Sequence, residues 1–282
     1  MKRVIVNADD FGLCQGVNRG IVLAHQKGIL TSATLMANMP GFDEAVEMAR
    51  DHPRLGVGVH LNLLRGEPVT PARDVASLVR ADGFLHGSAY AFIRKLGSGR
   101  ISGGDIEKEL RAQIEKAFAA GVPVSHFDSE KHLHMIPPVF RIVIRLAEEY
   151  RVPRVRYVRE CCLVPRVTQS FKALALSLSC RFMRRRILDH GIMTADHFYG
   201  ICRSGQMTAS RLRKVLARLG DGVTEIMVHP GFMTSDLLAM EKKIGSYYIN
   251  NLRERELQAL LDDGVKGLVR DGGIQLINFS EI

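Results

Sequence analysis

The chain has no tryptophan and few other aromatic residues. This scarcity narrows the classes of binding partner that its net positive charge could indicate. Among its 282 residues, lysine and arginine outnumber aspartate and glutamate by 39 to 30, so the formal net charge is +9. A basic balance is typical of proteins that meet nucleic acid, a membrane surface or an acidic substrate. Sequence-tolerant nucleic-acid binding relies on stacking of bases on aromatic rings, and few aromatic residues stand near the arginine clusters. We therefore predict no nucleic-acid partner.

Long apolar runs and paired cysteine spacings are also missing. No stretch reaches the roughly 18 apolar residues of a membrane helix, and the first residues lack the basic-then-apolar plan of a signal peptide. The five cysteines show no C-x-x-C spacing and are odd in number. We therefore expect reduced thiols and a cytoplasmic protein.

Short, apolar, β-branched runs alternate with helix-like segments almost throughout the chain. Strands are expected at residues 3–6, 32–38, 55–63, 122–128, 155–158, 225–229 and 274–279. Helices are expected after the first strand and at residues 42–50, 106–119, 139–149, 209–219 and 251–261. Repeated strand–helix units predict an α/β fold with a parallel sheet, open or closed into a barrel. Without a linker or repeat, one domain over residues 1–282 is the economical prediction.

The segment 161–195 departs from this rhythm. Phe171, Leu174, Leu178 and Phe182 fall on one helical face, and a basic cluster follows at residues 184–186. This pattern predicts a helical, basic insertion. It is typical of a packed helix with a solvated basic end, and also of a helix that adsorbs to an anionic membrane.

Two adjacent acidic residues, Asp9 and Asp10, follow the first strand-like run. In α/β enzymes the reacting groups gather beyond the carboxyl ends of the strands. Adjacent carboxylates repel each other, and a metal would keep one ionised while the other serves as a base. The alternative interpretation is a helix N-cap, for which one Asp would be enough.

A second cluster is the block from His126 to His134. Alternate strand residues share a face, so His126, Asp128 and Glu130 would point the same way. His132 and His134 follow in the loop. Imidazole and carboxylate side chains at this density predict a divalent metal site with an open coordination position.

Two single histidines complete the set. His60 ends a glycine-rich apolar strand, and His229 ends another that Pro230 and Gly231 follow. Each alone is a weak signal. With the acid pair and the metal block, they indicate metal-assisted hydrolysis, in which a carboxylate takes a proton from water and an imidazolium protonates the leaving group.

These residues, in this order, resemble the YdjC-like family of carbohydrate deacetylases. The matching motifs are Asn7-Ala8-Asp9-Asp10-Phe11-Gly12, Val59-His60-Leu61-Asn62, the block from His126 to His134, and Val228-His229-Pro230-Gly231. The resemblance implies a distorted (β/α) barrel similar to that of polysaccharide deacetylases. It also implies hydrolysis of the N-acetyl group of an amino sugar at one divalent metal ion.

By position in these motifs, the resemblance implies that Asp10 and His60 are metal ligands, Asp9 the general base and His229 the general acid. Arg156 matches an arginine that positions the base or the substrate. The chain departs from the family at Glu130, where a histidine usually provides the third ligand. Either Glu130 binds the metal, or His132 or His134 replaces it, and zinc and magnesium both remain open.

The version Ser129-Glu130-Lys131-His132-Leu133-His134-Met135 looks most like the hopanoid-biosynthesis-associated, HpnK-like branch. That branch implies deacetylation of N-acetylglucosaminyl bacteriohopanetetrol, a glycolipid. The alternatives are a deacetylase of soluble chito-oligosaccharides, a metal-dependent phosphoester hydrolase and a non-catalytic glycolipid-binding relative. Peripheral contact with the inner membrane and a homodimer both stay open.

Overall fold

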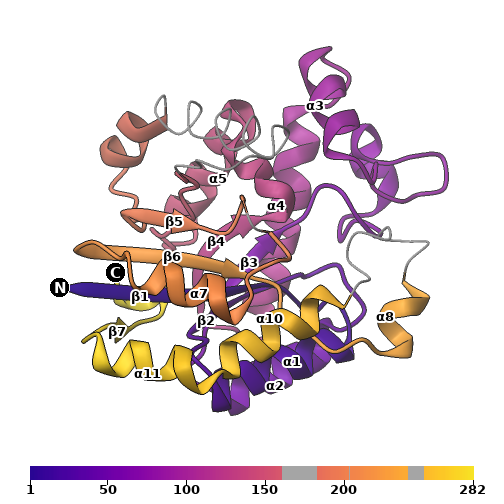
Figure 1. Cartoon of the computed structure of the whole chain (residues 1–282). Helices are drawn as coiled ribbons and strands as arrows, with labels where there is room; N and C mark the ends of the chain where they lie inside the picture. The colour runs from indigo at the N-terminus through magenta and orange to yellow at the C-terminus, as the bar shows by residue number, and fades with distance from the viewer. Residues whose placement is uncertain (161–182, 203, 241–250) are drawn as a thin grey trace.

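A parallel sheet forms the centre of the protein, in a computed structural model that describes residues 1–160, 183–202, 204–240 and 251–282 (Figure 1). The strands are β1 (Lys2–Phe11), β2 (Ser32–Leu35), β3 (Gly56–Leu61), β4 (Val124–Ser129), β5 (His197–Tyr199), β6 (Gly222–Val228) and β7 (Gln275–Leu276). Their order in the sheet is β4-β3-β2-β1-β6-β5, and every pair is parallel. The short β7 pairs with Arg3 and Val4 of β1, before β2 begins its pairing at Asn7.

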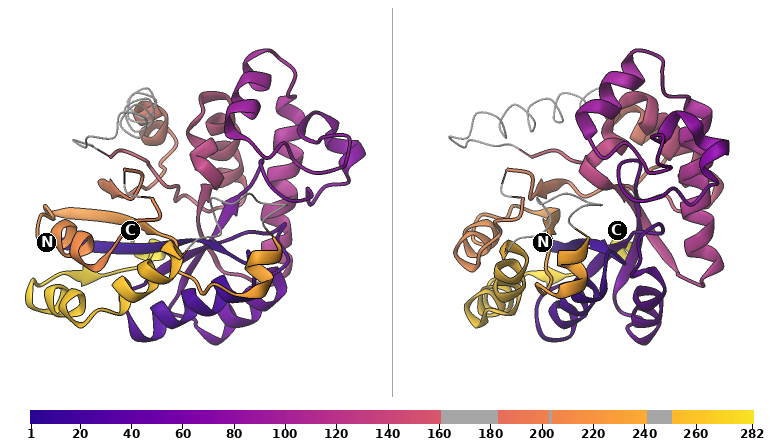
Figure 2. Two further views of the ribbon diagram at one scale, coloured as in Figure 1. Left: turned by 45° about the vertical axis from the view of Figure 1, so that its right-hand side comes forward. Right: turned by 90° about the vertical axis from the view of Figure 1, so that its right-hand side faces the viewer.

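The sheet curls into a half-barrel, as the two views of Figure 2 show. Isolated bridges continue the arc beyond β4, between Phe127 and Val155 and between Arg154 and Met193. The expected distorted (β/α) barrel is therefore confirmed. The expected strand at residues 155–158 is wrong, because pairing there is limited to these bridges.

Helices lie around the outside of the strands (Figure 2). The α-helices are α1 (Gln15–Lys27), α2 (Phe42–Asp51), α3 (Ala89–Gly97), α4 (Gly103–Ala119), α5 (Pro137–Glu149), α7 (Ala209–Leu216), α8 (Ser235–Ala239), α10 (Leu252–Leu261) and α11 (Asp263–Asp271). The 3-10 helices are η1 (Ala72–Leu78), η2 (Glu130–Met135) and η4 (Phe279–Glu281). The main hydrophobic core lies between these helices and the sheet.

Strand β1 shows how the two faces of the sheet differ. Val4, Val6 and Ala8 belong to the main core, while Ile5 belongs to a second, smaller apolar cluster. Because alternate strand residues share a face, Asn7 and Asp9 lie on the same inner face as Ile5. Both polar side chains are buried. The inside of the half-barrel is thus apolar near the amino ends of the strands and polar near their carboxyl ends.

The smaller cluster closes the amino-terminal end of the half-barrel, and we call it the barrel floor. It consists of Ile5, Ala195, Val223, Ile277 and Phe279. Phe279 stacks on the ring of His126, with centroids 3.6 Å apart and planes 12° apart. Residues near the C-terminus therefore pack inside the half-barrel, against the first strand.

Outside the sheet, the cysteines and the absence of membrane helices can be compared with the structure. Cys202 is disulfide-bonded, so the expectation that all thiols are reduced is wrong there. Cys14 is free and buried. Among the helices in the described parts of the chain, none combines the length and the apolar composition of a membrane span. The predicted basic insertion lies outside the described residues up to position 182.

Candidate metal centre and active site

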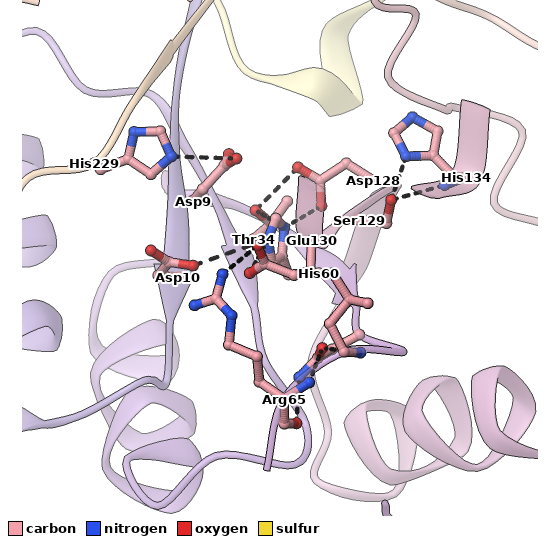
Figure 3. Close-up of polar contacts among 12 residues, drawn as sticks. Asp9, Asp10, Thr34, His60, Arg65, Asp128, Ser129, Glu130, His134 and His229 are labelled. Atoms are coloured by element: carbon pink, nitrogen blue, oxygen red, sulfur yellow. Dashed lines mark hydrogen bonds and ion pairs between the residues drawn. The ribbon is translucent and has the colours of Figure 1, made fainter. Parts of the chain in front are cut away.

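The residues singled out from the sequence meet at the carboxyl end of the sheet (Figure 3). Asp9 and Asp10 stand near the end of β1, and His60 and Asp128 are paired neighbours on β3 and β4. His229 directly follows β6, whose Val228 pairs with Ala8. Parallel strands bring their carboxyl ends to one edge, which is why motifs so far apart in the chain converge.

Arg156 holds the centre of this cluster and is fully buried. Its guanidinium donates to both oxygens of Asp9, at 3.0 and 2.7 Å. It also lies 2.7 Å from Asp128 Oδ2 and donates to Glu225 Oε1 at 2.7 Å. Burial opposes the charge on Asp9, but Arg156, with His60 and His229, keeps the pKa of Asp9 below its ordinary value. Asp9 is therefore a carboxylate at neutral pH.

His60 is oriented by its Nδ1. That nitrogen lies 2.7 Å from Asp128 Oδ1 and 3.2 Å from the hydroxyl of Thr34. With an acceptor carboxylate there, Nδ1 carries a hydrogen. Burial lowers the pKa of His60, but Asp128, with Asp9 and Glu130, outweighs this and raises it to about 9. A metal ion would therefore have to displace a proton from Nε2. Nε2 faces Glu130 Oε2 at 3.8 Å and Asp10 Oδ1 at 4.0 Å. The position of Asp128 thus turns Nε2 of His60 toward two carboxylates.

Asp10, His60 and Glu130 form a group that fits a metal ion. Each offers one ligand atom, and these atoms lie within 4.8 Å of one another. Ligand distances of about 2.0–2.2 Å to a bound ion place its ligands roughly 3–4 Å apart. The second oxygen of Asp10 accepts from Arg253, and the second oxygen of Glu130 accepts from Arg65. Every member therefore has one atom turned inward and another bonded to an orienting group.

A second group with metal-ligand geometry consists of Asp9, His60 and Asp128. Here the carboxylates already share Arg156, and His60 Nδ1 already contacts Asp128. An ion in this group would compete with a buried guanidinium. The donor set of Asp10, His60 and Glu130 fits a divalent cation better.

The backbone is left-handed at Asp10 and directly after Glu130, the two carboxylates of the candidate metal group. Asp10 has φ +70°, and Lys131 and His132, directly after Glu130, have φ +53° and +58°. Non-glycine residues adopt this region rarely, and such strain is concentrated at functional sites. These backbone turns aim the Asp10 and Glu130 side chains.

His132 and His134 do not join Asp10 and His60 in this arrangement. His134 Nδ1 lies 2.6 Å from Ser129 Oγ, and its Nε2 lies 3.0 Å from the carbonyl oxygen of Arg156. Burial and the nearby Arg156 lower the pKa of His134 to about 3, so its ring is neutral. His132 is buried, edge-on to His134 and Phe198. Of the three candidates for a third ligand, Glu130 has the matching geometry.

His126 shares the inner face of β4 with Asp128, as its spacing predicted, but lies deeper. Its ring sits on Phe279, and its Nδ1 lies 2.8 Å from Ser125 Oγ. Burial first, and then Arg156, lowers the pKa of His126 well below the ordinary value. His126 is a neutral part of the barrel interior beneath the site.

His229 lies at the mouth of the site, with 15 % of its side chain exposed. Its Nε2 is 3.9 Å from Asp9 Oδ2, and its Nδ1 is 3.8 Å from Glu256 Oε2. Burial lowers the pKa of His229, but Glu256 and the two aspartates outweigh this and raise it. A protonated imidazole is thus favoured beside the carboxylate of Asp9.

Sequence reasoning missed five buried residues that support this site. They are Thr34, Arg65, Glu225, Arg253 and Glu256. Glu225 carried a signal, because an acid within the apolar strand β6 needs a buried partner. The charged residues of α10 carried none, since they look like the solvated face of an amphipathic helix.

The chain is similar to a known protein family and to relatives that share one name. The family model described as YdjC-like protein matches residues 3–271. A protein of Brevibacillus brevis named carbohydrate deacetylase is 40% identical over 99% of both chains. One of the same name from Halalkalibacterium halodurans is 42% identical, covering 90% of this chain and 94% of its own.

Solved structures include a similar protein of Enterococcus faecalis, described as a candidate cellobiose-phosphate cleavage protein. It is 27% identical, has a TM-score of 0.77, and the match covers 99% of this chain and 98% of that one. A family 4 carbohydrate esterase of Streptomyces lividans is more remote, with 10% identity and a TM-score of 0.44 over 98% of this chain and 91% of that one.

Proposed function

Since the chain belongs to the YdjC-like protein family, we propose that it is a carbohydrate deacetylase that uses one divalent metal ion. Curated relatives up to 42% identical carry the name carbohydrate deacetylase. The observation that carries the proposal is the grouping of Asp10, His60 and Glu130, each with a separate orienting partner. Such outer partners are expected around a metal site.

The proposed reaction is hydrolysis of the N-acetyl group of an amino sugar. Water adds to the acetyl carbonyl carbon, the carbon–nitrogen bond breaks, and acetate and a free amine leave. Asp10, His60 and Glu130 would hold the ion, which when bound polarises the carbonyl and makes water more acidic. Zinc and magnesium are both compatible with an imidazole and two carboxylates.

Asp9 is the proposed general base. Its carboxylate is ionised, and Arg156 fixes both oxygens from one side. A carboxylate has about four lone-pair positions, so each oxygen can still accept a proton from attacking water. Arg156 acts as a positioning residue, because its hydrogen bonds fix the carboxylate plane.

His229 is the proposed general acid. It stands across the site from His60, at the partly exposed mouth where a sugar would enter. A raised pKa keeps its imidazole protonated until the nitrogen of the breaking amide requires the proton. Base and acid stay distinct because Arg156 favours the charged form of Asp9, while Glu256 favours the charged form of His229.

For the substrate, we propose N-acetylglucosaminyl bacteriohopanetetrol, a sugar carried on a rigid triterpene. This rests on the sequence of the block from Ser129 to Met135, and above all on Glu130. The names of the relatives favour acetylated carbohydrates in general, so soluble chito-oligosaccharides are the second candidate.

Mass spectrometry of the purified protein with this glycolipid, with and without a chelator, tests the proposal. We expect a loss of one acetyl group that the chelator abolishes and added metal restores. Turnover of diacetylchitobiose without turnover of the glycolipid would keep the deacetylase and discard the hopanoid substrate. Inactivity on both, with metal bound, would favour a glycolipid-binding relative.

A further inference from the structure

Helix α10 has buried charges in its first two turns. Arg253 and Glu256 are three residues apart, so they lie on the same helix face, and only 4 % and 1 % of these residues is exposed. Buried charges are unfavourable unless they are paired and hydrogen-bonded. The partners of these two residues are therefore informative, and both partners belong to the proposed active site.

Arg253 contacts the end of β1. Its Nη2 donates to Asp10 Oδ2, while Asp10 Oδ1 faces His60 Nε2. Asp10 stands on a left-handed backbone, where its carboxylate is not directed by the regular pleat. The bond from Arg253 therefore selects which oxygen of Asp10 faces the other metal-ligand candidates.

Glu256 contacts the loop after β6. Its Oε2 accepts from the backbone N–H of His229 at 2.5 Å and lies 3.8 Å from Nδ1 of the same residue. Its Oε1 accepts from the N–H of Met207 at 2.8 Å, so the carboxylate is fixed at both oxygens. A carboxylate on the Nδ1 side orients the imidazole and turns Nε2 toward Asp9.

We propose that the first two turns of α10 position both halves of the reaction machinery, Arg253 through Asp10 and Glu256 through His229. Arg253 and Glu256 are positioning residues, since they act through Asp10 and His229. The inference rests on the proposed function, and it adds that metal affinity and proton delivery are set from one helix through separate side chains. Because the two contacts are separate, each residue has its own measurable consequence.

The test for Arg253 is metal affinity, measured by calorimetry with Zn²⁺ alone. Loss of a residue that orients a metal ligand typically lowers metal affinity 10–100-fold. We expect the Zn²⁺ affinity of Arg253→Gln to decrease by a factor in that range. Arg253→Lys should recover part of the loss, because it restores the charge but not the planar fork. Arg255→Gln is the matched control, because Arg255 is exposed on the same helix.

The test for Glu256 is the division of its effect between kcat and KM. Glu256→Gln should lower kcat at least tenfold while KM and Zn²⁺ affinity stay within about twofold, because His229 acts only on the leaving group. Glu256→Asp keeps the negative charge, so its kcat should lie between those of Glu256→Gln and the wild type.

Three results would overturn the inference. Arg253→Gln could bind Zn²⁺ as tightly as the wild type, Glu256→Gln could retain kcat, or each variant could lose both properties to the same extent. The last result would mean that α10 only stabilises the fold, and thermal unfolding of every variant separates this case. Wild-type protein without deacetylase activity would instead contradict the proposed function, while the Zn²⁺ comparison would still decide the role of Arg253.

Discussion

Glu130 stands where the resemblance to the family leads us to expect a histidine, and Arg65 lies against it. The extra negative charge of Glu130, relative to a histidine, is therefore matched by a buried cation. As a proposed ligand, Glu130 would provide oxygen in place of nitrogen and would favour hard cations more than an imidazole would.

Glu130→His should shift the metal preference toward zinc. We expect the ratio of Zn²⁺ to Mg²⁺ affinity to rise by roughly tenfold or more, since imidazole suits zinc and carboxylate suits magnesium. Competition titrations with both ions measure this ratio. Glu47→His, at an exposed position of α2, is the control. Unchanged affinities for both ions would show that Glu130 is not a ligand.

His229 gives a pH dependence whose sign follows from its neighbours. Glu256, Asp9 and Asp10 raise the pKa of His229 against the effect of burial. A general acid must be protonated, so kcat should fall as pH rises through this raised pKa. Glu256→Gln removes one of the causes, and the alkaline limb of the kcat profile should move to lower pH. A limb in the same place would mean that another group titrates there.

Glu225 gives a second pH dependence, this time of stability. Burial raises the pKa of Glu225 to about 7, although Arg156 opposes the shift. The folded protein thus retains this proton at pH values where the unfolded chain has lost it. The contribution of Glu225 becomes less favourable as pH rises from about 4.5 to 7, by about 3 kcal/mol in total.

Urea unfolding of the metal-free protein at pH 5 and pH 8 tests this sign. Glu225→Gln cannot titrate, so its free energy of unfolding relative to the wild type should increase between the two pH values. Glu47→Gln should show no such change, because Glu47 is exposed. A constant difference between Glu225→Gln and the wild type would contradict the assignment.

At the scale of elements, β3 and β4 approach closely through Gly58. A Cβ there would lie 2.5 Å from His126 Nδ1 and 2.6 Å from the His126 carbonyl oxygen. Rotation of the ring cannot relieve the second contact, so β3 and β4 would have to separate. The pair of His60 and Asp128 joins the same two strands. The glycine therefore fixes the spacing on which the orientation of His60 depends.

Gly58→Ala should lower the free energy of unfolding by about 1–3 kcal/mol, the usual range for overpacking, and weaken metal binding. Gly97→Ala is a suitable control, because nothing lies within 4 Å of a Cβ at Gly97 in α3. Thermal unfolding and Zn²⁺ titration of both variants measure the two effects. Gly58→Ala with wild-type metal affinity would show that strand spacing does not limit the site.

Some of the strands could be predicted from the sequence, and others could not. Strands β1, β3 and β6 were predictable because buried parallel strands contain apolar runs, whereas β4 carries polar residues at alternate positions. The strand expected at residues 155–158 has the same character but forms only bridges, since its neighbours are a single residue of β4 and Met193. Pairing depends on what lies alongside, which a local pattern does not contain.

The candidate site was predictable in part for a similar reason. Asp10, His60 and Glu130 stand at or just after strand ends, and parallel topology brings strand ends together. Arg65 and Arg253 depend on the path of a loop and the docking of a helix. The positions of His132 and His134 depend on left-handed backbone at Lys131 and His132, where no glycine marks the turn.

For the whole molecule, the barrel floor makes stability depend on the C-terminal residues. Phe279 is fully buried against His126 and the apolar residues Ile5 and Val223. Phe279→Ala should lower the free energy of unfolding by about 3–5 kcal/mol, as for other buried Phe residues. Phe118→Ala, at a position 38 % exposed, should have a much smaller effect. Equal losses in urea unfolding would contradict a structural role for the floor.

The pairing of β1 also has a consequence for synthesis on the ribosome. β1 emerges before its neighbours β6 and β7, which are more than 200 residues later in the chain. Until they emerge, one edge of β1 and part of the other have no partner, and exposed strand edges invite aggregation. Asp9 and Asp10 would therefore be translated long before the strands that complete their surroundings, so nascent chains would need protection during that interval.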